Sequence, residues 1–225
     1  MIKVKIEEKE YSLPTKWSEV SLKQFKLLTK LEEGDDMTPH RKLIERFKIV
    51  VSPELDDALI GQFDVESFYK IVEKMSFITS VPKDKENKVV KIEKQKFGML
   101  QDLKELSVGE WADLEYFIDK SEDNIINEAE NILAILVRPL SEESKEYGEY
   151  KYTLQKYDSR SLDSRRKYFL EKLNAEQAMS YINFFLSLET EYIKTTLNSL
   201  MQSPKMKKMK KLPLTQENIV KIMGG

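Results

Sequence analysis

Two stretches of the chain decide its fold: VKIEEKEYSLPTKWSEVSLKQFKLLTKL at residues 4–31 and VKIEKQKFGMLQDLKELSVGEWADLEYF at residues 90–117. They align without a gap, because residue 90 lies 86 positions after residue 4. At the same offset, the run at residues 47–53 falls on the run at residues 133–139. A register kept over so long a span is typical of an internal repeat. The sequence therefore predicts two tandem copies of one unit.

Each predicted copy opens with apolar residues at every second position, which predicts a short β-hairpin. The alternating residues are Val4, Ile6, Val90 and Ile92. A serine then follows, with Gln or Glu three residues later, a spacing typical of a capping box at the start of a helix. The pairs are Ser21 with Gln24, and Ser107 with Glu110.

The helices that follow these serines carry apolar side chains every third residue. On this pattern, Phe25 and Trp111 are expected to occupy equivalent buried positions. A second helix is expected to end at the Ser52–Pro53 step in one copy and at the Arg138–Pro139 step in the other, because proline disfavours helical geometry in the residue before it. Asp64 is expected to cap a further helix.

These patterns divide the chain into a first repeat at residues 1–80, a linker at 81–88 and a second repeat at 89–203. The linker is polar and lacks apolar periodicity. The second repeat carries an insertion at residues 140–160, and residues 204–225 form a basic C-terminal tail. The expected fold class is α+β, mainly α, with an internal duplication in which each copy is a short β-hairpin followed by helices.

The insertion at residues 140–160 mixes tyrosines with charged residues. Such a pattern is typical of a contact loop or an edge strand, because tyrosine offers a large apolar surface with a polar tip. On this interpretation Tyr147, Tyr150 and Tyr152 are candidate partner-binding residues. The alternative is a solvent-exposed segment held against its own domain, and the sequence leaves both interpretations open.

The tail has six lysines and one glutamate, a net charge of +5, whereas the whole chain is −2 and the remainder is therefore −7. Five of these lysines cluster and are candidate partner-binding residues: Lys205, Lys207, Lys208, Lys210 and Lys211. They could neutralise phosphates or dock on an acidic protein surface, so nucleic acid is a candidate partner only through this tail. A solubilising tail is the alternative.

The composition excludes several classes of site. The chain has 225 residues, no Cys and one His, with hydrophobic residues at 40% and charged residues at 34%. This apolar content is enough for a folded core. Without Cys there are no disulfides, thiol nucleophiles or thiolate zinc sites, and one His excludes a multi-histidine metal site within a protomer. No run of about 18 uncharged apolar residues and no secretory leader is seen, so a protein without membrane association is expected.

Recognisable catalytic motifs are also missing from the sequence. The seven glycines form no nucleotide-binding loop. No serine has the G-x-S-x-G context of a hydrolase nucleophile, and His40 is interpreted as a polar surface residue. Acidic residues are dense at residues 119–130 but lack calcium-loop spacing. No cofactor, metal or active site is expected, and a carboxylate-based hydrolase is a distant alternative.

The segment Tyr11–Phe25, followed by an isoleucine-rich helix, resembles small structural and assembly proteins of tailed bacteriophages. The run Leu133–Pro139 with the later pair Phe184–Phe185 is similar to virion-associated proteins of crAss-like phages that infect Bacteroidota. The resemblance spans most of residues 2–200 in outline and includes no catalytic motif. The basic tail departs from it.

This resemblance implies a non-enzymatic component of a tailed phage particle, such as a neck or tail ring protein or a packaged cargo protein. It implies contacts with other virion proteins in an oligomeric assembly, and location in the virion after synthesis in the host bacterial cytoplasm. A tail assembly chaperone that binds its partner transiently is the alternative.

Overall fold

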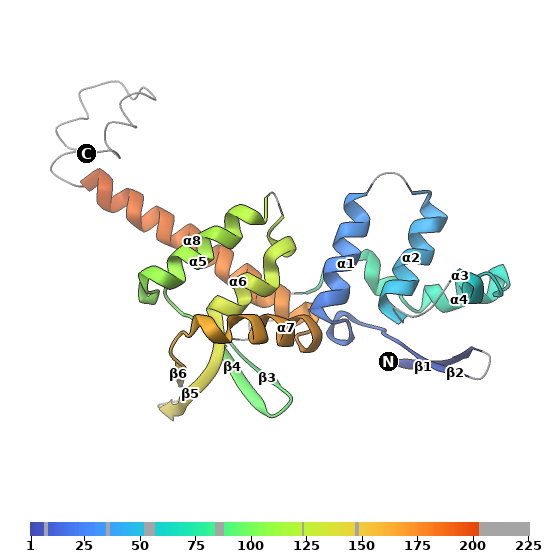
Figure 1. The fold of residues 1–225 in the computed structure, drawn as a ribbon, viewed down its shortest axis with the longest axis horizontal. Coiled ribbons are helices and arrows are strands. Elements are labelled where there is room, and N and C mark those ends of the chain that lie inside the picture. Colours follow the sequence, from blue (N-terminus) through green and yellow to red (C-terminus); the bar gives the residue numbers. More distant parts are fainter. Residues whose placement is uncertain are drawn as a thin grey trace, which may run out of the picture. The chain divides into compact units, whose positions relative to one another are not determined.

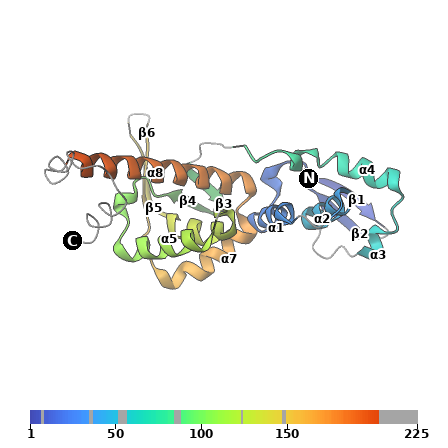
Figure 2. The same ribbon diagram turned by 90° about the horizontal axis from the view of Figure 1, so that it is seen from above.

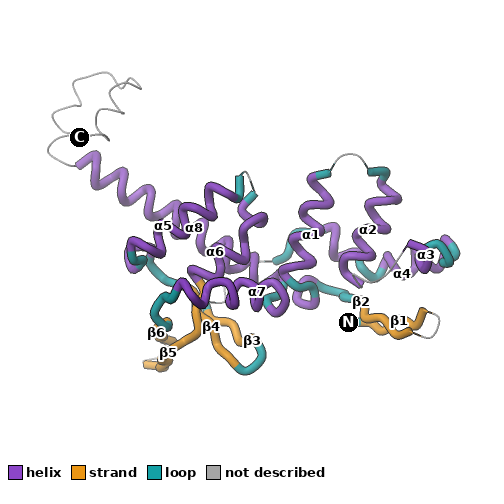
Figure 3. The backbone as a smooth tube through the Cα atoms, in the orientation of Figure 1, coloured by secondary structure: helices purple, strands orange, loops and turns teal. Residues whose placement is uncertain are grey.

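The computed structural model describes residues 1–202 except for 7–8, 35–36, 52–56, 84–87, 123 and 147–148. The chain divides into two compact units, Met1–Phe185 and Leu186–Gly225. Helices predominate, and the strands form two separate antiparallel sheets (Figures 1 and 3). The predicted class, α+β and mainly α, is confirmed. The boundary predicted at residues 81–88 falls inside the first compact unit.

The first sheet is a hairpin that leads into a capped helix. Its elements are β1 (Ile2–Ile6), β2 (Lys9–Leu13), the 3-10 turn η1 (Trp17–Glu19) and α1 (Leu22–Glu33). Trp17 organises the packing here, because its ring meets Phe25 and Phe77 edge to face at centroid distances of 5.4 and 5.2 Å. Its indole N–H donates to the carbonyl of Ser80 over 3.0 Å.

An aromatic cluster joins the next helices. They are α2 (Pro39–Val51), α3 (Asp57–Ile60), α4 (Val65–Glu73) and the 3-10 turn η2 (Ser76–Thr79). Phe47 and Phe68 are buried and lie edge to face at 5.5 Å, with Phe63 within 6.5 Å of both rings. Asp64 caps α4 by accepting a hydrogen bond from the amide of Ser67, as predicted.

The second sheet has four strands in the order β3-β4-β5-β6, so β3 and β6 are its edges among the described residues. The strands are β3 (Val89–Ile92), β4 (Gln95–Met99), β5 (Val137–Glu146) and β6 (Glu149–Leu154). In the register of β4 with β5, Gly98 lies opposite Arg138. A bulge between Leu140 and Glu142 interrupts the pairing of β5 with β6.

The remaining helices lie between and after the strands of this sheet and bury many apolar side chains. They are η3 (Leu103–Glu105), α5 (Val108–Lys120), η4 (Ile125–Glu128), α6 (Ala129–Leu136), η5 (Ser159–Ser161), α7 (Leu162–Lys172) and α8 (Ala175–Gln202). The central helix is α6, which packs between α5 and α7 and buries Ile132 through Leu136 completely. A helix that is apolar all round belongs inside a core.

The order hairpin, 3-10 turn, capped helix recurs along the chain. Ser21 and Ser107, 86 residues apart, each complete a capping box at the start of α1 and α5. Leu13 and Met99, at the same offset, are both fully buried. The match does not extend to the sheets, since β1 and β2 pair only with each other whereas β3 and β4 belong to a four-stranded sheet. Duplication of one unit stays a prediction.

Three local expectations differ from the structure. The helix α6 ends at Leu136, and Arg138 and Pro139 lie in β5, so the predicted helix end at that step is wrong. Strand pairing takes over there, because Met99 pairs with Val137 and Phe97 with Pro139. The Ser52–Pro53 step lies outside the described residues, and α2 ends at Val51.

The other two differences concern packing and helix length. Phe25 is buried, but Trp111 is only partly buried, so the two positions are not equivalent. The apolar patterns from Asn174 to Phe185 and from Phe184 to Leu200 predict two helices, whereas the structure has a single helix there, α8 (Figure 2).

The starts of α1 and α8 are tied together. Ser21 and Asn174, which precede the two helices, form an isolated antiparallel bridge. The amide of Leu22 donates to the carbonyl of Leu173, and the amide of Ala175 donates to the carbonyl of Val20, each over 2.8 Å. Two backbone hydrogen bonds therefore join segments whose bridged residues, Ser21 and Asn174, are 153 residues apart in the sequence.

Candidate functional site

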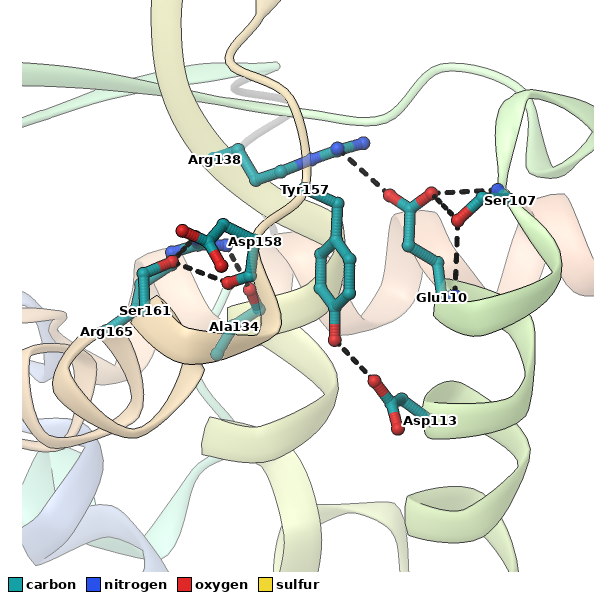
Figure 4. Close-up of polar contacts among 9 residues, drawn as sticks. All are labelled: Ser107, Glu110, Asp113, Ala134, Arg138, Tyr157, Asp158, Ser161 and Arg165. Carbon is teal, nitrogen blue, oxygen red and sulfur yellow. Dashed lines mark hydrogen bonds and ion pairs between the residues drawn. The ribbon is translucent and has the colours of Figure 1, made fainter.

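The candidate site begins with Glu110 in the first turn of α5. One carboxylate oxygen, Oε2, accepts hydrogen bonds from the amide and the hydroxyl of Ser107, at 2.8 and 2.5 Å. These bonds satisfy donors that a helix start leaves unpaired. The other oxygen, Oε1, faces β5, where Nη1 of Arg138 lies 2.9 Å away (Figure 4). One side chain thus caps α5 and pairs with the second sheet.

The Glu110–Arg138 ion pair is buried, with side chains only 6% and 7% exposed. Burial makes such a pair sensitive to its geometry, because two desolvated charges need further hydrogen bonds to offset the loss of water. Here Oε1 of Glu110 contacts Nη1 of Arg138 but makes no further hydrogen bond among the described residues, and Nε of Arg138 makes none there. The buried pair therefore leaves the Nε–H donor of Arg138 unsatisfied among those residues.

A second contact joins α5 to the segment before α7. Asp113 lies one turn after Glu110, and its Oδ2 accepts a hydrogen bond of 2.5 Å from the hydroxyl of Tyr157 (Figure 4). Burial and the neighbouring Asp113 carboxylate raise the pKa of Tyr157 well above its usual value. The phenol is therefore neutral at physiological pH and serves as a hydrogen-bond donor.

Arg165 of α7 binds the C-terminal turn of α6. Its guanidinium donates to the carbonyl of Ala134 and to the hydroxyl of Ser161, each over 2.6 Å. Ala134 is in the last turn of α6, where carbonyls lack helical partners, so the arginine satisfies a helix end. Burial and the proximity of Arg138 lower the pKa of Arg165.

Tyr152 of β6 reaches across the sheet to β4. Its hydroxyl donates to the carbonyl of Met99 over 2.7 Å and accepts from the side-chain amide of Gln101. Burial raises its pKa to about 12. Directly opposed residues of an antiparallel pair share a face. Arg138 therefore lies on the face of the sheet where Tyr152 covers its partner Gly98.

A cavity of about 570 Å³ lies between these elements. Its walls are the end of β4 with the connection to α5, the Glu110–Arg138 pair, and the consecutive residues 152–157. Polar groups are gathered on its surface, including Gln101, Ser107 and Tyr157. The arrangement can hydrogen-bond a ligand that carries both a donor and an acceptor.

The predicted partner-binding residues differ in exposure and in contacts. Tyr150 is 46% exposed on β6, whereas Tyr152 is partly buried and bound to β4. The two rings are neighbours, with centroids 6.1 Å apart. The side chain of Tyr147 lies outside the described residues, as do Lys205, Lys207, Lys208, Lys210 and Lys211. The insertion therefore contains an edge strand and is also bound to its own domain, and its role in partner binding stays a prediction.

The sequence interpretation did not find the buried pair. Arg138 could have been noticed, because it follows the uninterrupted apolar run Ile132–Val137 and a charge beside such a run needs a partner. Glu110 was recognised only as part of a capping box. No local pattern links the two residues, because their contact depends on how β5 packs against α5.

A second cavity, of about 470 Å³, lies between α2, α3 and α4. Apolar residues such as Ile44, Ile60 and Phe68 line it together with His40. His40 is exposed, and its Nδ1 lies 3.1 Å from the hydroxyl of Tyr69.

In the part of the chain that the structure describes, no three His, Cys, Asp or Glu side chains gather as metal ligands. No helix in those same ranges has the length and apolar character needed to cross a bilayer. A scan against protein-family models and searches of curated proteins and of solved structures gave no match.

Proposed function

We propose that the chain is a non-enzymatic structural or interaction component of a tailed phage particle that acts through protein–protein contacts. The contact mode is supported by β6, one of the two edges of the four-stranded sheet among the described residues, and by its exposed Tyr150. An open edge presents backbone donors and acceptors to which an extended segment of a partner can add as a further strand.

The ring of Tyr150 is held in place before any partner arrives. Its hydroxyl donates to Glu143 on β5, and Glu143 is paired with Lys96 on β4 at 2.7 Å. Three adjacent strands thereby fix one exposed aromatic side chain. An ordered tyrosine loses little conformational freedom on binding, which favours its use as an anchor in an interface.

Assignment to a phage particle is supported by the sequence resemblance of residues 11–25 and 133–139 alone. On that assignment the partners are other virion proteins in an oligomeric assembly, and the site of action is the virion. The lysine cluster of the tail provides a second contact region, for protein or nucleic acid. A transient assembly chaperone would use the same edge but leave the finished particle.

Two measurements test this proposal. Mass spectrometry of purified particles should detect the chain in stoichiometric amount, and its presence only in infected-cell lysate would favour the chaperone instead. Capture experiments should compare Tyr150→Ser with Tyr116→Ser, a matched control, since Tyr116 is an exposed tyrosine of α5. We expect the first variant alone to lose partners. Equal capture by both variants would contradict a role for β6.

A further inference from the structure

We propose that copies of this chain associate head to tail. The α5 face of one copy, formed by Val108, Ala112 and Asp119, docks at the cavity between α2, α3 and α4 of the next copy. The inference goes beyond the proposed function, because it uses surfaces other than β6 and does not depend on a phage particle. Its pattern is the contact of α1 with the start of α8 inside the chain.

The contact inside the chain joins two capped helix starts. Ser21 caps α1 and Asn174 caps α8, by accepting hydrogen bonds from the amides of Gln24 and Gln177. The two backbone hydrogen bonds at this bridge use the first amide of each helix, which has no partner within its own helix. The four residues beside the caps are completely buried: Val20, Leu22, Leu173 and Ala175.

A second pair of capped helix starts has the same local geometry. Ser107 caps α5, 86 residues after Ser21, and Asp64 caps α4, 110 residues before Asn174. In the predicted internal repeat, Ser107 is the counterpart of Ser21 and Asp64 is that of Asn174. The backbone angles φ and ψ are −70° and 159° at Ser21, −69° and 162° at Ser107, and −69° and 150° at Asp64. Ser107 and Asp64 are therefore shaped to form a bridge like that of Ser21.

The residues beside this second pair of caps are exposed instead of buried. Val108, the counterpart of Leu22, is 89% exposed, and Val65, the counterpart of Ala175, is 69% exposed. Among the described residues, the amides of these valines and the carbonyls of Leu106 and Phe63 make no backbone hydrogen bond. Because both valines are exposed, the two surfaces do not cover each other within one chain. A second copy would supply each with its partner.

The cavity has walls that correspond to those around α1. Inside the chain α1 packs on η4 and α7, and their counterparts in the first repeat, the start of α2 and α3, wall the cavity with α4. Lys26 of α1 forms an ion pair with Glu130. Their counterparts are Ala112, exposed on α5, and Ile44, which lines the cavity. An apolar pair thus replaces the ion pair, so neither surface would bury an unpaired charge there.

Polar groups also match further along the helix. Glu33 at the end of α1 accepts a hydrogen bond from the side-chain amide of Asn124. Their counterparts are Asp119, exposed on α5, and Thr38, which lines the cavity. A hydroxyl can donate to a carboxylate, so the pair keeps one donor and one acceptor.

Charge favours the same contact. Asp119 is acidic, whereas Arg41 is exposed at the cavity. The two carboxylates that line the cavity belong to Glu45 and Asp57, and both are already paired with Lys48. The contact would use different surfaces of the two copies, so each copy keeps one of each for a further copy. Such association gives a ring when the rotation between copies closes and a filament when it does not.

Sedimentation velocity of the full chain over a range of concentrations tests this inference. Val108→Glu and Val65→Glu each place a charge in one surface, at a first helical residue where an acidic side chain is favourable. We expect each variant to weaken self-association at least about tenfold, because the charge would be buried without a partner. The control is Val81→Glu, at a valine that is 74% exposed and in neither surface, which should associate like the unmodified chain.

A mixture of the two variants tests the head-to-tail arrangement itself. Val108→Glu keeps the cavity and Val65→Glu keeps the α5 face, so an equimolar mixture should form heterodimers and stop at two chains. A mixture that stays monomeric would overturn the inference. So would single variants that associate normally, or an unmodified chain that is monomeric up to about 100 µM.

Amide hydrogen exchange of the unmodified chain gives a test that needs no variant. The amides of Val65 and Val108 should become protected only at concentrations where the chain associates, and unchanged exchange would contradict the contact. Circular dichroism checks the folding of each variant.

Failure of this inference and failure of the proposed function give different results. If Tyr150→Ser loses partner capture while Val108→Glu and Val65→Glu associate normally, the edge is used and the head-to-tail contact is wrong. If the two valine variants behave as expected but Tyr150→Ser captures partners normally, the head-to-tail contact stands and the proposed contact through β6 is wrong.

Discussion

The ring of Tyr152 lies directly on the backbone of Gly98, so closely that a Cβ atom at position 98 would be 2.6 Å from Cε2 of the tyrosine. This contact brings β6 over β4 although β5 separates the two strands in the sheet. It also sets one wall of the cavity, since Tyr152 lines it. The absent side chain of Gly98 is thus a condition for the shape of the candidate site.

Substitution Gly98→Ala should displace the Tyr152 ring and weaken its hydrogen bond to Met99. We expect the free energy of unfolding to fall by about 1–3 kcal/mol, as for overpacked sites. Urea denaturation measures this. The matched control is Gly109→Ala in α5, where an added Cβ meets nothing within 4 Å. Alanine is the better helix former, so the control should gain up to about 1 kcal/mol, and equal effects at both positions would contradict the packing argument.

Removal of either capping serine should destabilise the chain. Ser21→Ala and Ser107→Ala each delete a side-chain acceptor for a helix amide, with hydrogen bonds of 3.2 and 3.3 Å to Gln24 and Glu110. The expected loss is about 1 kcal/mol for each, from thermal or urea unfolding. Threonine at the same positions should restore most of it, because its hydroxyl can cap in the same way. No loss in the alanine variants would show that the caps do not stabilise the fold.

Phe25→Ala and Trp111→Ala should differ in cost despite their matched positions in the sequence. Phe25 is 8% exposed and packs on Trp17, so its truncation should cost about 3–5 kcal/mol. Trp111 is only partly buried, and we expect a smaller loss. Equilibrium denaturation of both variants, compared with Leu114→Ala as a buried reference on α5, checks this order. A larger loss for Trp111 would reverse it.

The stability of the fold should fall in alkaline solution. The pKa of Tyr152 is about 12 in the folded chain, against 10 as the ordinary value. Between these values the unfolded chain has released the proton and the folded chain has kept it, so stability is complete below pH 10 and declines as pH rises toward 12. Each such group contributes at most about 1.4 kcal/mol per pH unit.

Urea unfolding across this pH range should therefore give a shallower slope for Tyr152→Phe than for the unmodified chain. The comparison is between slopes, because the variant also loses the hydrogen bond to Met99 at every pH. Tyr157 and Tyr181 have raised pKa values too and keep part of the slope. Identical slopes would show that Tyr152 ionises alike in both states.

Deletion of residues 204–225 should leave the melting temperature nearly unchanged and weaken assembly. The segment lies outside the described residues, and its composition has too few apolar side chains for a core of its own. Replacement of the five clustered lysines by glutamine should weaken assembly in a salt-dependent way. Sedimentation velocity at two salt concentrations measures it. Unfolding of the truncated chain would show that the tail belongs to the core.

The sequence predicted those helices and strands whose start or pattern is set by a few neighbouring residues. The serine with Gln or Glu three residues on marked the starts of α1 and α5, and the apolar alternation marked β1 with β2 and β3 with β4. These features depend on neighbours within one turn of chain, so the sequence displays them directly. The same holds for Asp64 at the start of α4.

Features that depend on distant contacts were not predictable in this way. Arg138 and Pro139 indicated a helix end, because proline disfavours helical geometry in the residue before it. Proline does not indicate which structure replaces the helix. Pairing with β4 decides that the chain continues as a strand, two residues earlier than expected. Likewise, nothing near Tyr152 in the sequence indicates Gly98 or Met99 as its partners. The candidate site is built from such contacts. The sequence indicated only its capping box, formed by Ser107 and Glu110.

The bridge between Ser21 and Asn174 bears on how the chain would respond to cleavage. Two backbone hydrogen bonds at the helix starts, together with the ion pair of Lys26 with Glu130, cross from the first eighty residues to the remainder. A cut after Lys83 would break the only covalent connection between those regions and none of these contacts. The two fragments would then remain a noncovalent complex in native buffer and separate only in denaturant. Size-exclusion chromatography in native buffer would therefore not distinguish the cleaved protein from the intact chain.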